Sequence, residues 1–456
     1  MKIRRINFQL DKKTYYQFSK IAEDSGITKS KLLNSWIEST QNIYFKPDSI
    51  TYPTNYNFRV IEKISQKIEE LRYYTGLQTS VLLRSIIIEQ VEMNADSTAF
   101  LSNLKLEWEK GNYKGIISLA ENNQEMQFNQ LVYVFRSYME LGDFIEVPAI
   151  LEELKFKAGS QEECLRLKVL EADYLLYTQK HTEALVLLEK VHEEADYLRF
   201  TDVKGLAAIH LGEYYGIKDD WNKSIDYLQE SIEYLNIFKY PVEFLKIYLR
   251  LIIANIYRGC FEEVESLITR VERLLVKVNN RHYEGWFKNN IALYKQMRGE
   301  VDLSRKYIEE SIHLNLYSNS KLDLSFYMKN LAKIMIYNNK FEDGMRIINK
   351  AYEYESFSRP NLNYSRTYQL KLMLMARYDY ENSIITMERM LKNSIYPNLG
   401  NYYYQVTKYL FAKDKKEKEL GIEGLKKIKE EGGYPYVRKA ADSTLKSGRL
   451  VLLGYR

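Results

Sequence analysis

Residues 290–311, NIALYKQMRGEVDLSRKYIEES, contain one complete copy of the pattern that decides the fold of this chain. A small residue, Ala292, is followed by the turn Gly299-Glu300, by the turn marker Val301 and by a second small residue, Ser304. Apolar residues at helical spacing flank the turn on both sides, which predicts two helices joined by a tight connection. Small side chains at Ala292 and Ser304 are expected to let these helices cross closely.

The same pattern recurs along most of the chain. Its turn marker is repeated at intervals of 40 residues, and finally 39, at His181, Trp221, Phe261, Val301, Phe341 and Tyr380. Mostly small residues stand three positions after each marker and nine positions before it. A helix pair of this kind cannot bury its apolar face alone, so the repeat predicts stacked pairs that form a solenoid with a concave groove.

This pattern resembles the tetratricopeptide repeat, which has a small residue in the first helix, an aromatic residue after the turn and a small residue in the second helix. The resemblance covers residues 97–430, and the period of 40 exceeds the usual period of about 34. It implies a superhelical solenoid. Residues 431–456 are predicted to cap the stack or, alternatively, to form a dimer contact.

A second repeat, with an offset of 50 residues, occupies residues 1–95. Asn7-Phe8-Gln9-Leu10 corresponds to Asn57-Phe58-Arg59-Val60. Each copy opens with alternating polar and apolar residues, which predicts a strand, and continues with two segments of helical spacing. Because a single short strand leaves its edges unpaired, the two copies are expected to pair in antiparallel, with four helices on the apolar face of the ribbon.

The polar face of this ribbon has residue types that recognise base edges. It comprises Arg5, Asn7, Gln9, Asn55, Asn57 and Arg59. Arginine pairs with guanine and asparagine or glutamine with adenine in the major groove, which admits a two-stranded ribbon. The starts of the second helices, near Thr28, Lys29 and Thr79, are expected to hold phosphates through backbone N–H groups.

These two units resemble the ribbon-helix-helix DNA-binding family of Arc/MetJ type, in a tandem arrangement. The motifs that carry the resemblance are RINFQL and NYNFRV for the strands, and GITKSKLL and GLQTSVLL for the second-helix starts. An ordinary solvated ribbon without DNA contacts is the alternative. Pairing of the units within one chain or between two chains stays open.

The first helix of each repeat is expected to line the groove, so equivalent positions would form ladders of side chains. The candidate peptide-binding residues are His210, Lys246, Arg250, Tyr257, Trp286, Asn289, Asn290, Phe326, Lys329, Asn330, Tyr337 and Gln369. Their amides suit the N–H and C=O groups of a peptide, their aromatic rings suit its side chains, and their cations suit a carboxylate. The alternative is a solvated face that repeats because the fold repeats.

Composition excludes several other classes. Only 20 Gly and 7 Pro in 456 residues are too few for an all-β fold, and a net charge of +5 does not by itself indicate a nucleic-acid partner. Two cysteines without metal or redox spacing favour a reducing cytoplasm, and no apolar run predicts a membrane span. Motifs for catalysis, metal or phosphate binding are absent, so we expect neither an enzyme nor a cofactor nor a catalytic or metal site.

The expected fold is therefore mostly α, with an N-terminal tandem ribbon-helix-helix unit followed by a tetratricopeptide-like α-solenoid. This combination resembles the intracellular peptide-pheromone receptors of Gram-positive bacteria, their plasmids and phages, including the arbitrium type, although their head is usually a helix-turn-helix. The resemblance implies a transcription regulator, with a double-stranded DNA operator, a short signalling peptide and a homodimer. The alternatives are a protein-interaction scaffold, or a plasmid or phage accessory factor that binds DNA constitutively.

Overall fold

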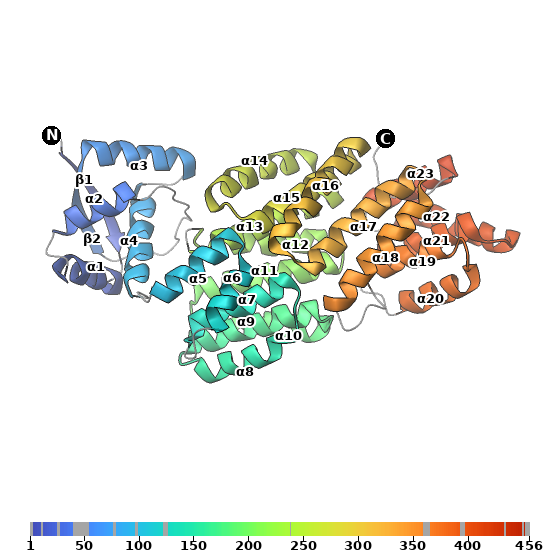
Figure 1. The fold of residues 1–456 in the computed structure, drawn as a ribbon. Coiled ribbons are helices and arrows are strands. Elements are labelled where there is room, and N and C mark those ends of the chain that lie inside the picture. The colour runs from blue at the N-terminus through green and yellow to red at the C-terminus, as the bar shows by residue number, and fades with distance from the viewer. Residues whose placement is uncertain are drawn as a thin grey trace.

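The computed structural model describes residues 3–10, 12–24, 28–39, 54–75, 79–95, 99–121, 126–237, 239–358, 365–392, 397–432, 435–448 and 451. Figure 1 shows a small unit of strands and helices at the N-terminal end, followed by a curved stack of helices that makes up the rest of the molecule. No helix among the described residues combines the length and the apolar character that a membrane crossing requires.

The N-terminal unit repeats a strand-helix-helix order. Its elements are β1 (Ile3–Leu10), α1 (Lys12–Asp24), α2 (Lys29–Ser39), β2 (Thr54–Ile61), α3 (Glu62–Thr75) and α4 (Thr79–Ala95). The two strands pair in antiparallel. Helix α2 contacts β2 and α4 contacts β1, so each half packs on the strand of the other half around a core that includes Phe18, Leu33 and Leu83.

The helical body consists of antiparallel helix pairs. The first helices are α5 (Ala99–Lys110), α7 (Phe128–Leu141), α9 (Gln161–Tyr177), α11 (Thr201–Ile217), α13 (Pro241–Arg258), α15 (Arg281–Met297), α17 (Lys321–Tyr337), α19 (Arg366–Met375) and α21 (Pro397–Phe411). The second helices are α6 (Tyr113–Glu121), α8 (Val147–Lys157), α10 (His181–Tyr197), α12 (Trp221–Tyr234), α14 (Phe261–Val278), α16 (Val301–Ser318), α18 (Phe341–Ser358), α20 (Tyr380–Lys392) and α22 (Lys415–Glu431). The body is therefore a tetratricopeptide-like α-solenoid.

The turn markers coincide with helix starts. Each of the six predicted markers is the first residue of a second helix. Two positions before five of them the backbone takes a left-handed conformation, with φ of 68° at Gln179, 63° at Asp219, 79° at Gly259, 78° at Gly299 and 59° at Asn339. Glycine, asparagine and aspartate tolerate this conformation best, which explains the residue types of four of these five turns.

Small residues bring the paired helices together, as the repeat predicts. The Oγ atom of Ser224 donates a hydrogen bond to the backbone oxygen of Gly212, and Ser304 does the same to Ala292, both at 2.7 Å. A Cβ atom on Gly212 would stand 2.8 Å from Cγ of Leu228. The small side chains therefore allow both close packing and a direct link between helices.

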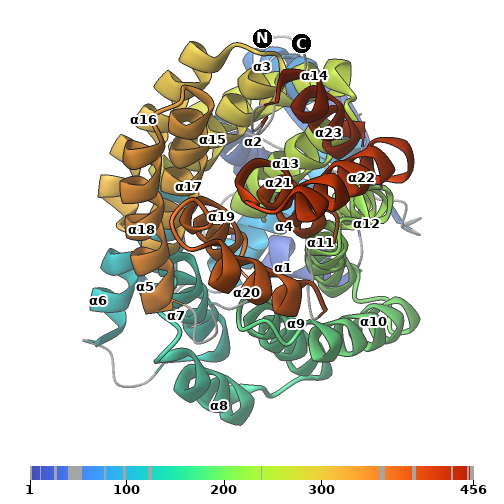
Figure 2. The same ribbon diagram turned by 90° about the vertical axis from the view of Figure 1, so that its right-hand side faces the viewer.

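The stack curves until distant helices meet. Figure 2, a view along the molecule, shows α10, α14, α16 and α18 on the outside and α11, α13, α17 and α19 nearer the axis. Arg136 of α7 forms an ion pair with Glu243 of α13, and Asn280 donates a hydrogen bond of 3.3 Å to the backbone oxygen of Trp108. The body thus curves far enough to bring α7 into contact with α13, and the residue before α15 into contact with α5.

The described part of the C-terminal segment packs on the end of the stack. Helix α23 (Pro435–Ser447) contacts α21 and α22. The Oη atom of Tyr402 lies 2.8 Å from Oγ1 of Thr444 and donates a hydrogen bond of 2.6 Å to the backbone oxygen of Val451. Of the segment 431–456, residues 433–434, 449–450 and 452–456 lie outside the described residues.

Candidate functional site

A cavity of about 260 Å³ lies on the concave side of the solenoid. Its lining comes from the first helices α7, α9, α11, α13, α15, α17 and α19, with further residues from α12 and α18. Seven of the candidate peptide-binding residues are part of this lining: Arg250, Tyr257, Trp286, Asn289, Asn290, Phe326 and Lys329. Residues from seven consecutive repeats therefore share one cavity.

Aromatic and aliphatic side chains form much of the cavity wall. Trp221 stacks on Tyr257 with ring centroids 4.7 Å apart, beside Ile253 and Leu293. Gly216 lies next to this stack, and a Cβ atom there would stand 3.3 Å from the Trp221 ring. The bare backbone of α11 thus leaves room for a large apolar surface in the cavity.

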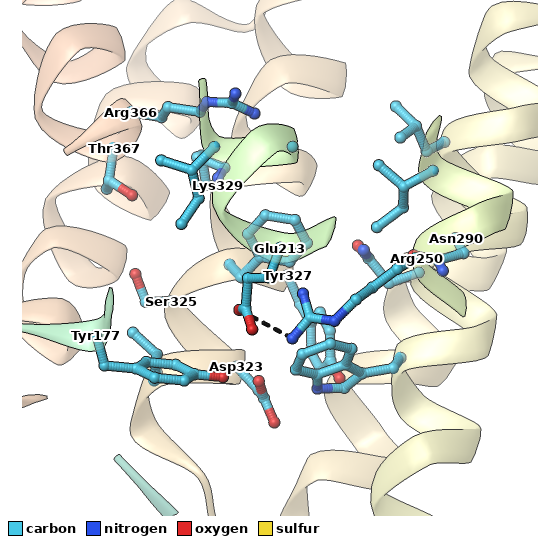
Figure 3. Close-up of a pocket in the computed structure, with 18 of the residues that line it drawn as sticks. Tyr177, Glu213, Arg250, Asn290, Asp323, Ser325, Tyr327, Lys329, Arg366 and Thr367 are labelled. Atoms are coloured by element: carbon cyan, nitrogen blue, oxygen red, sulfur yellow. Dashed lines mark ion pairs between the residues drawn. The ribbon is translucent and has the colours of Figure 1, made fainter. Parts of the chain in front are cut away.

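An ion pair crosses the middle of the cavity. The Nη2 atom of Arg250 lies 2.8 Å from Oε1 of Glu213, as the dashed line in Figure 3 marks. Burial alone would raise the pKa of Glu213, but Arg250 and His210 lower it well below its usual value. Glu213 is therefore ionised at neutral pH, and it neutralises Arg250 in place.

A cluster of three titratable side chains lies beside this ion pair. It comprises Asp173, His210 and Glu213, whose possible metal-ligand atoms all lie within 4.8 Å of one another. Burial alone would lower the pKa of His210, but Asp173 and Glu213 raise it to about 9, so its ring is protonated at neutral pH. A metal ligand must be the neutral imidazole, and Arg250 adds a further positive charge beside Glu213. The three residues thus form a charge network.

A second network joins the repeats beneath the cavity. Glu140 of α7 forms an ion pair with Lys246, accepts a hydrogen bond of 2.9 Å from Tyr283 and lies 3.0 Å from Nε2 of His282. The other ring nitrogen of His282 lies 3.3 Å from Asp323. Glu140 and Asp323 also line the larger cavity, whereas Lys246 lines a smaller one together with His210, so this network ties together the helices that form both cavities.

One end of the cavity holds the cationic side chains of Arg366 and Lys329. Figure 3 places Arg366, Thr367 and Lys329 at one end and Tyr177 and Asp323 at the other, with the Glu213–Arg250 pair between them. The Nη2 atom of Arg366 lies 3.0 Å from Oδ1 of Asp219, and the Lys329 ammonium lies 4.0 Å from the centre of the Phe326 ring. This end has the groups that receive a carboxylate.

Several of the candidate peptide-binding residues make hydrogen bonds or packing contacts with neighbouring helices. Asn330 donates a hydrogen bond of 2.9 Å to Oδ1 of Asn289, and Asn290 donates one of 2.9 Å to the backbone oxygen of Leu249. Gln369 is buried against Gly400, and Tyr337 is 40% exposed and stands outside the lining. Asn290 and Asn330 are therefore hydrogen-bonded to neighbouring first helices, and of these two only Asn290 also lines the cavity.

Sequence reasoning missed important members of the site. Glu140, Glu213, Asp323, Arg366 and Thr367 all line the cavity. Glu213 follows His210 by three positions and so shares its helix face, a spacing that could have nominated it. Arg366 and Asp323 lie in the first turns of α19 and α17, where nothing in the local pattern distinguishes them from ordinary helix starts.

In the N-terminal unit the register places the six base-reading candidates together. Asn7 is paired with Asn57, Arg5 with Arg59 and Gln9 with Asn55, so all six positions occupy one face of the ribbon. Thr28 is exposed, and its Oγ1 accepts a hydrogen bond of 3.3 Å from the N–H of Lys31.

The other two candidates at the second-helix starts are partly covered. The Lys29 ammonium donates hydrogen bonds to Tyr15 and Ser19 of α1, at 2.9 and 3.2 Å, and Thr79 is half-buried at the first position of α4. The side chain of Lys29 is therefore held against its own unit.

Comparisons with known proteins return similarities of fold only. No family model matches the chain, and a search of curated sequences finds no match. A Rap protein complexed with competence and sporulation factor aligns with 70% of this chain and 95% of its own, at 9% identity and a TM-score of 0.49. The Cut9–Hcn1 hetero-tetramer aligns with 75% of this chain and 66% of its own, at 12% identity and a TM-score of 0.47.

A third solved structure extends over nearly the whole chain. It is a signal transduction ATPase with a tetratricopeptide repeat sensor from Pyrococcus horikoshii, which aligns with 95% of this chain and 67% of its own, at 13% identity and a TM-score of 0.39. The assignment of the body to a tetratricopeptide-like α-solenoid rests on its own helix pairs and turns.

Proposed function

We propose that this chain is a sequence-specific DNA-binding transcription regulator whose solenoid binds a short signalling peptide. The observation that carries the proposal is the cavity on the concave face, which unites aromatic rings, amides and opposite charges from successive repeats. Its volume of about 260 Å³ lies near the lower end of ligand pockets, so it suits a few residues of a peptide rather than a folded partner.

The distribution of charge suggests how a peptide would lie. A free C-terminal carboxylate is matched by Arg366 and Lys329, and a cationic group by Asp323 at the far end. Apolar side chains would contact Trp286, Phe326 and the stacked Trp221 and Tyr257 rings. Because these residues come from five successive repeats, an occupied cavity would hold those repeats in one mutual arrangement.

The N-terminal unit supports the DNA-binding half of the proposal. An antiparallel ribbon with arginine, asparagine and glutamine on one face fits the major groove and has the residue types that read guanine and adenine there. Peptide binding would shift the solenoid between two arrangements and so change the affinity of the head for its operator.

Affinity selection from a random hexapeptide library, with free C-termini and mass-spectrometric readout, tests the peptide half. We expect wild-type protein to enrich peptides that a Phe326→Ala variant loses, because Phe326 lines the cavity. Phe357→Ala is the matched control, since Phe357 is exposed on α18 and lies outside the lining. Equal enrichment by all three proteins, or none by wild type, would contradict peptide binding in this cavity.

Gel-shift selection from a random duplex library tests the DNA half separately. Wild-type protein should enrich a defined motif, and Asn7→Ala with Gln9→Ala should relax the preference at the corresponding base pairs. Absence of any retained DNA would instead favour a scaffold in which the ribbon only joins the two halves of the head.

A further inference from the structure

The strand register makes the two ends of the ribbon chemically different. Three pairs of polar residues lie directly opposite each other, in the order Arg5–Arg59, Asn7–Asn57 and Gln9–Asn55. Residues opposite each other in antiparallel strands share a face, and so do residues two apart along a strand. One end of this face therefore has two arginines, and the other end has two amides.

The internal repeat locates the approximate two-fold axis of the ribbon. Each residue of β1 corresponds to the residue 50 positions later in β2. Asn7 is paired with Asn57, which is its own equivalent in the repeat, so the axis passes between these two residues. The axis exchanges Arg5 with Asn55 and Gln9 with Arg59, and neither exchange conserves the residue type.

Symmetry would forbid this difference in a ribbon built from two identical chains. A true two-fold axis makes both ends identical, and a symmetric reader matches a palindromic operator. Here both strands belong to one chain, so the two ends are free to differ, and they do.

We infer that the head of this protein reads a non-palindromic DNA site and binds it in one orientation. Guanine contacts belong to the end with Arg5 and Arg59, because arginine is bidentate to guanine O6 and N7. Adenine contacts belong to the centre and to the end with Gln9 and Asn55, because amides are bidentate to adenine N6 and N7. This inference rests on the proposed DNA-binding function and adds the form of the operator to it.

The test uses the full-length chain and a random duplex library of about two helical turns, at one fixed salt concentration because affinity for DNA depends on salt. We expect the enriched motif to have G·C pairs at one end and A·T pairs toward the other. Fluorescence anisotropy then compares this site with two palindromes, each made by mirroring one half. Each should bind roughly 5- to 150-fold more weakly, the discrimination typical of a lost bidentate contact.

Double variants that make the two ends of the ribbon alike should prefer a palindromic site. Gln9→Arg with Asn55→Arg places arginine at both ends, so the variant should prefer the palindrome made from the guanine half over the wild-type site. Asn55→Arg with Arg59→Gln makes the second strand repeat the first, and it too should prefer a palindrome. The second pair keeps the number of arginines unchanged, which separates symmetry from added positive charge, and it serves if the first variant does not fold.

The possible outcomes distinguish DNA binding itself from the non-palindromic form of the site. A palindromic wild-type motif, or retained DNA with no base preference, overturns the non-palindromic site while leaving DNA binding intact. A wild-type chain that retains no DNA overturns both. A folded double variant that keeps the wild-type asymmetric preference shows that these positions do not determine the order of bases.

Discussion

The guanidinium of Arg366 lies 3.0 Å from the carboxylate of Asp219, although 147 residues separate them in the chain. Asp219 occupies the left-handed position of the turn between α11 and α12, and Arg366 begins α19. Burial raises the pKa of Asp219 to about 6, while Arg366 opposes this shift. One ion pair thus links the turn between α11 and α12 to α19, and all three of these helices contribute to the cavity lining.

Removing Arg366 should destabilise the solenoid. Arg366→Ala leaves the carboxylate of Asp219 buried without this cation, and loss of one partner of a buried pair costs about 3–5 kcal/mol. Urea unfolding followed by circular dichroism measures the change in free energy of unfolding. Arg346→Ala is the control, because its pair with Asp343 is exposed and should be worth less than about 1 kcal/mol. Equal losses in the free energy of unfolding would show that the ion pair with Asp219 contributes no more stability than an exposed ion pair.

Glu140 should stabilise the closed superhelix in a pH-dependent way. Burial alone would raise its pKa, but Lys246 and His282 lower it well below the usual value of 4.5. A carboxylate with a lowered pKa contributes stability that is full above its unfolded pKa and is lost as the pH falls.

The free energy of unfolding of wild type should therefore exceed that of Glu140→Gln at pH 6, and the difference should shrink between pH 5 and pH 3. The exposed Glu309→Gln change is the control. A difference between wild type and Glu140→Gln that stays constant over this range would contradict the role of the Glu140 charge.

Because of Lys333, the protein should be more stable in mild alkali than at neutral pH. Burial, with Arg366 nearby, lowers its pKa to about 7, whereas the unfolded chain keeps the usual value near 10.5. Between these values the unfolded state binds more protons, so folding stability rises with pH by roughly 1 kcal/mol per unit. Lys333→Met should therefore be more stable than wild type at pH 7 and lose that advantage toward pH 10.

Thermal unfolding of both proteins from pH 7 to pH 10 measures the effect. Lys350→Met is the control, since Lys350 is exposed on the next helix. If the stability difference between Lys333→Met and wild type does not change with pH, the ammonium of Lys333 is not the group that is poorly solvated.

Gly421 should be intolerant of a side chain. A Cβ atom there would stand 2.6 Å from the backbone N of Tyr409 and 3.0 Å from the backbone O of Gln405. Since backbone atoms cannot move aside as a flexible side chain does, Gly421→Ala should separate α22 from α21 and cost about 1–3 kcal/mol. Gly159→Ala is the control, because its Cβ would meet only Glu163, at 3.8 Å. Calorimetry should show a lower Tm for the first variant only.

The sequence by itself determined the local plan of this protein. Turn markers such as Trp221 and Phe261 begin the second helices, and the polar or glycine residues before them hold the left-handed turns. The alternation around Asn7 and Asn57 predicted two strands that the structure places over Ile3–Leu10 and Thr54–Ile61. These features depend on neighbours along the chain, where hydrophobic period, small residues and turn chemistry act directly.

Only the tertiary structure decided which side chains share the cavity. Superhelical curvature is the sum of small rotations between successive repeats, and a local pattern does not specify that sum. The curvature places Glu140 next to His282 and Asp219 next to Arg366. It also turns the side chains of Asn290 and Asn330 toward neighbouring helices. The same holds for the ribbon, where pairing within one chain set Arg5 opposite Arg59, because register arises from the packing of both halves rather than from either strand alone.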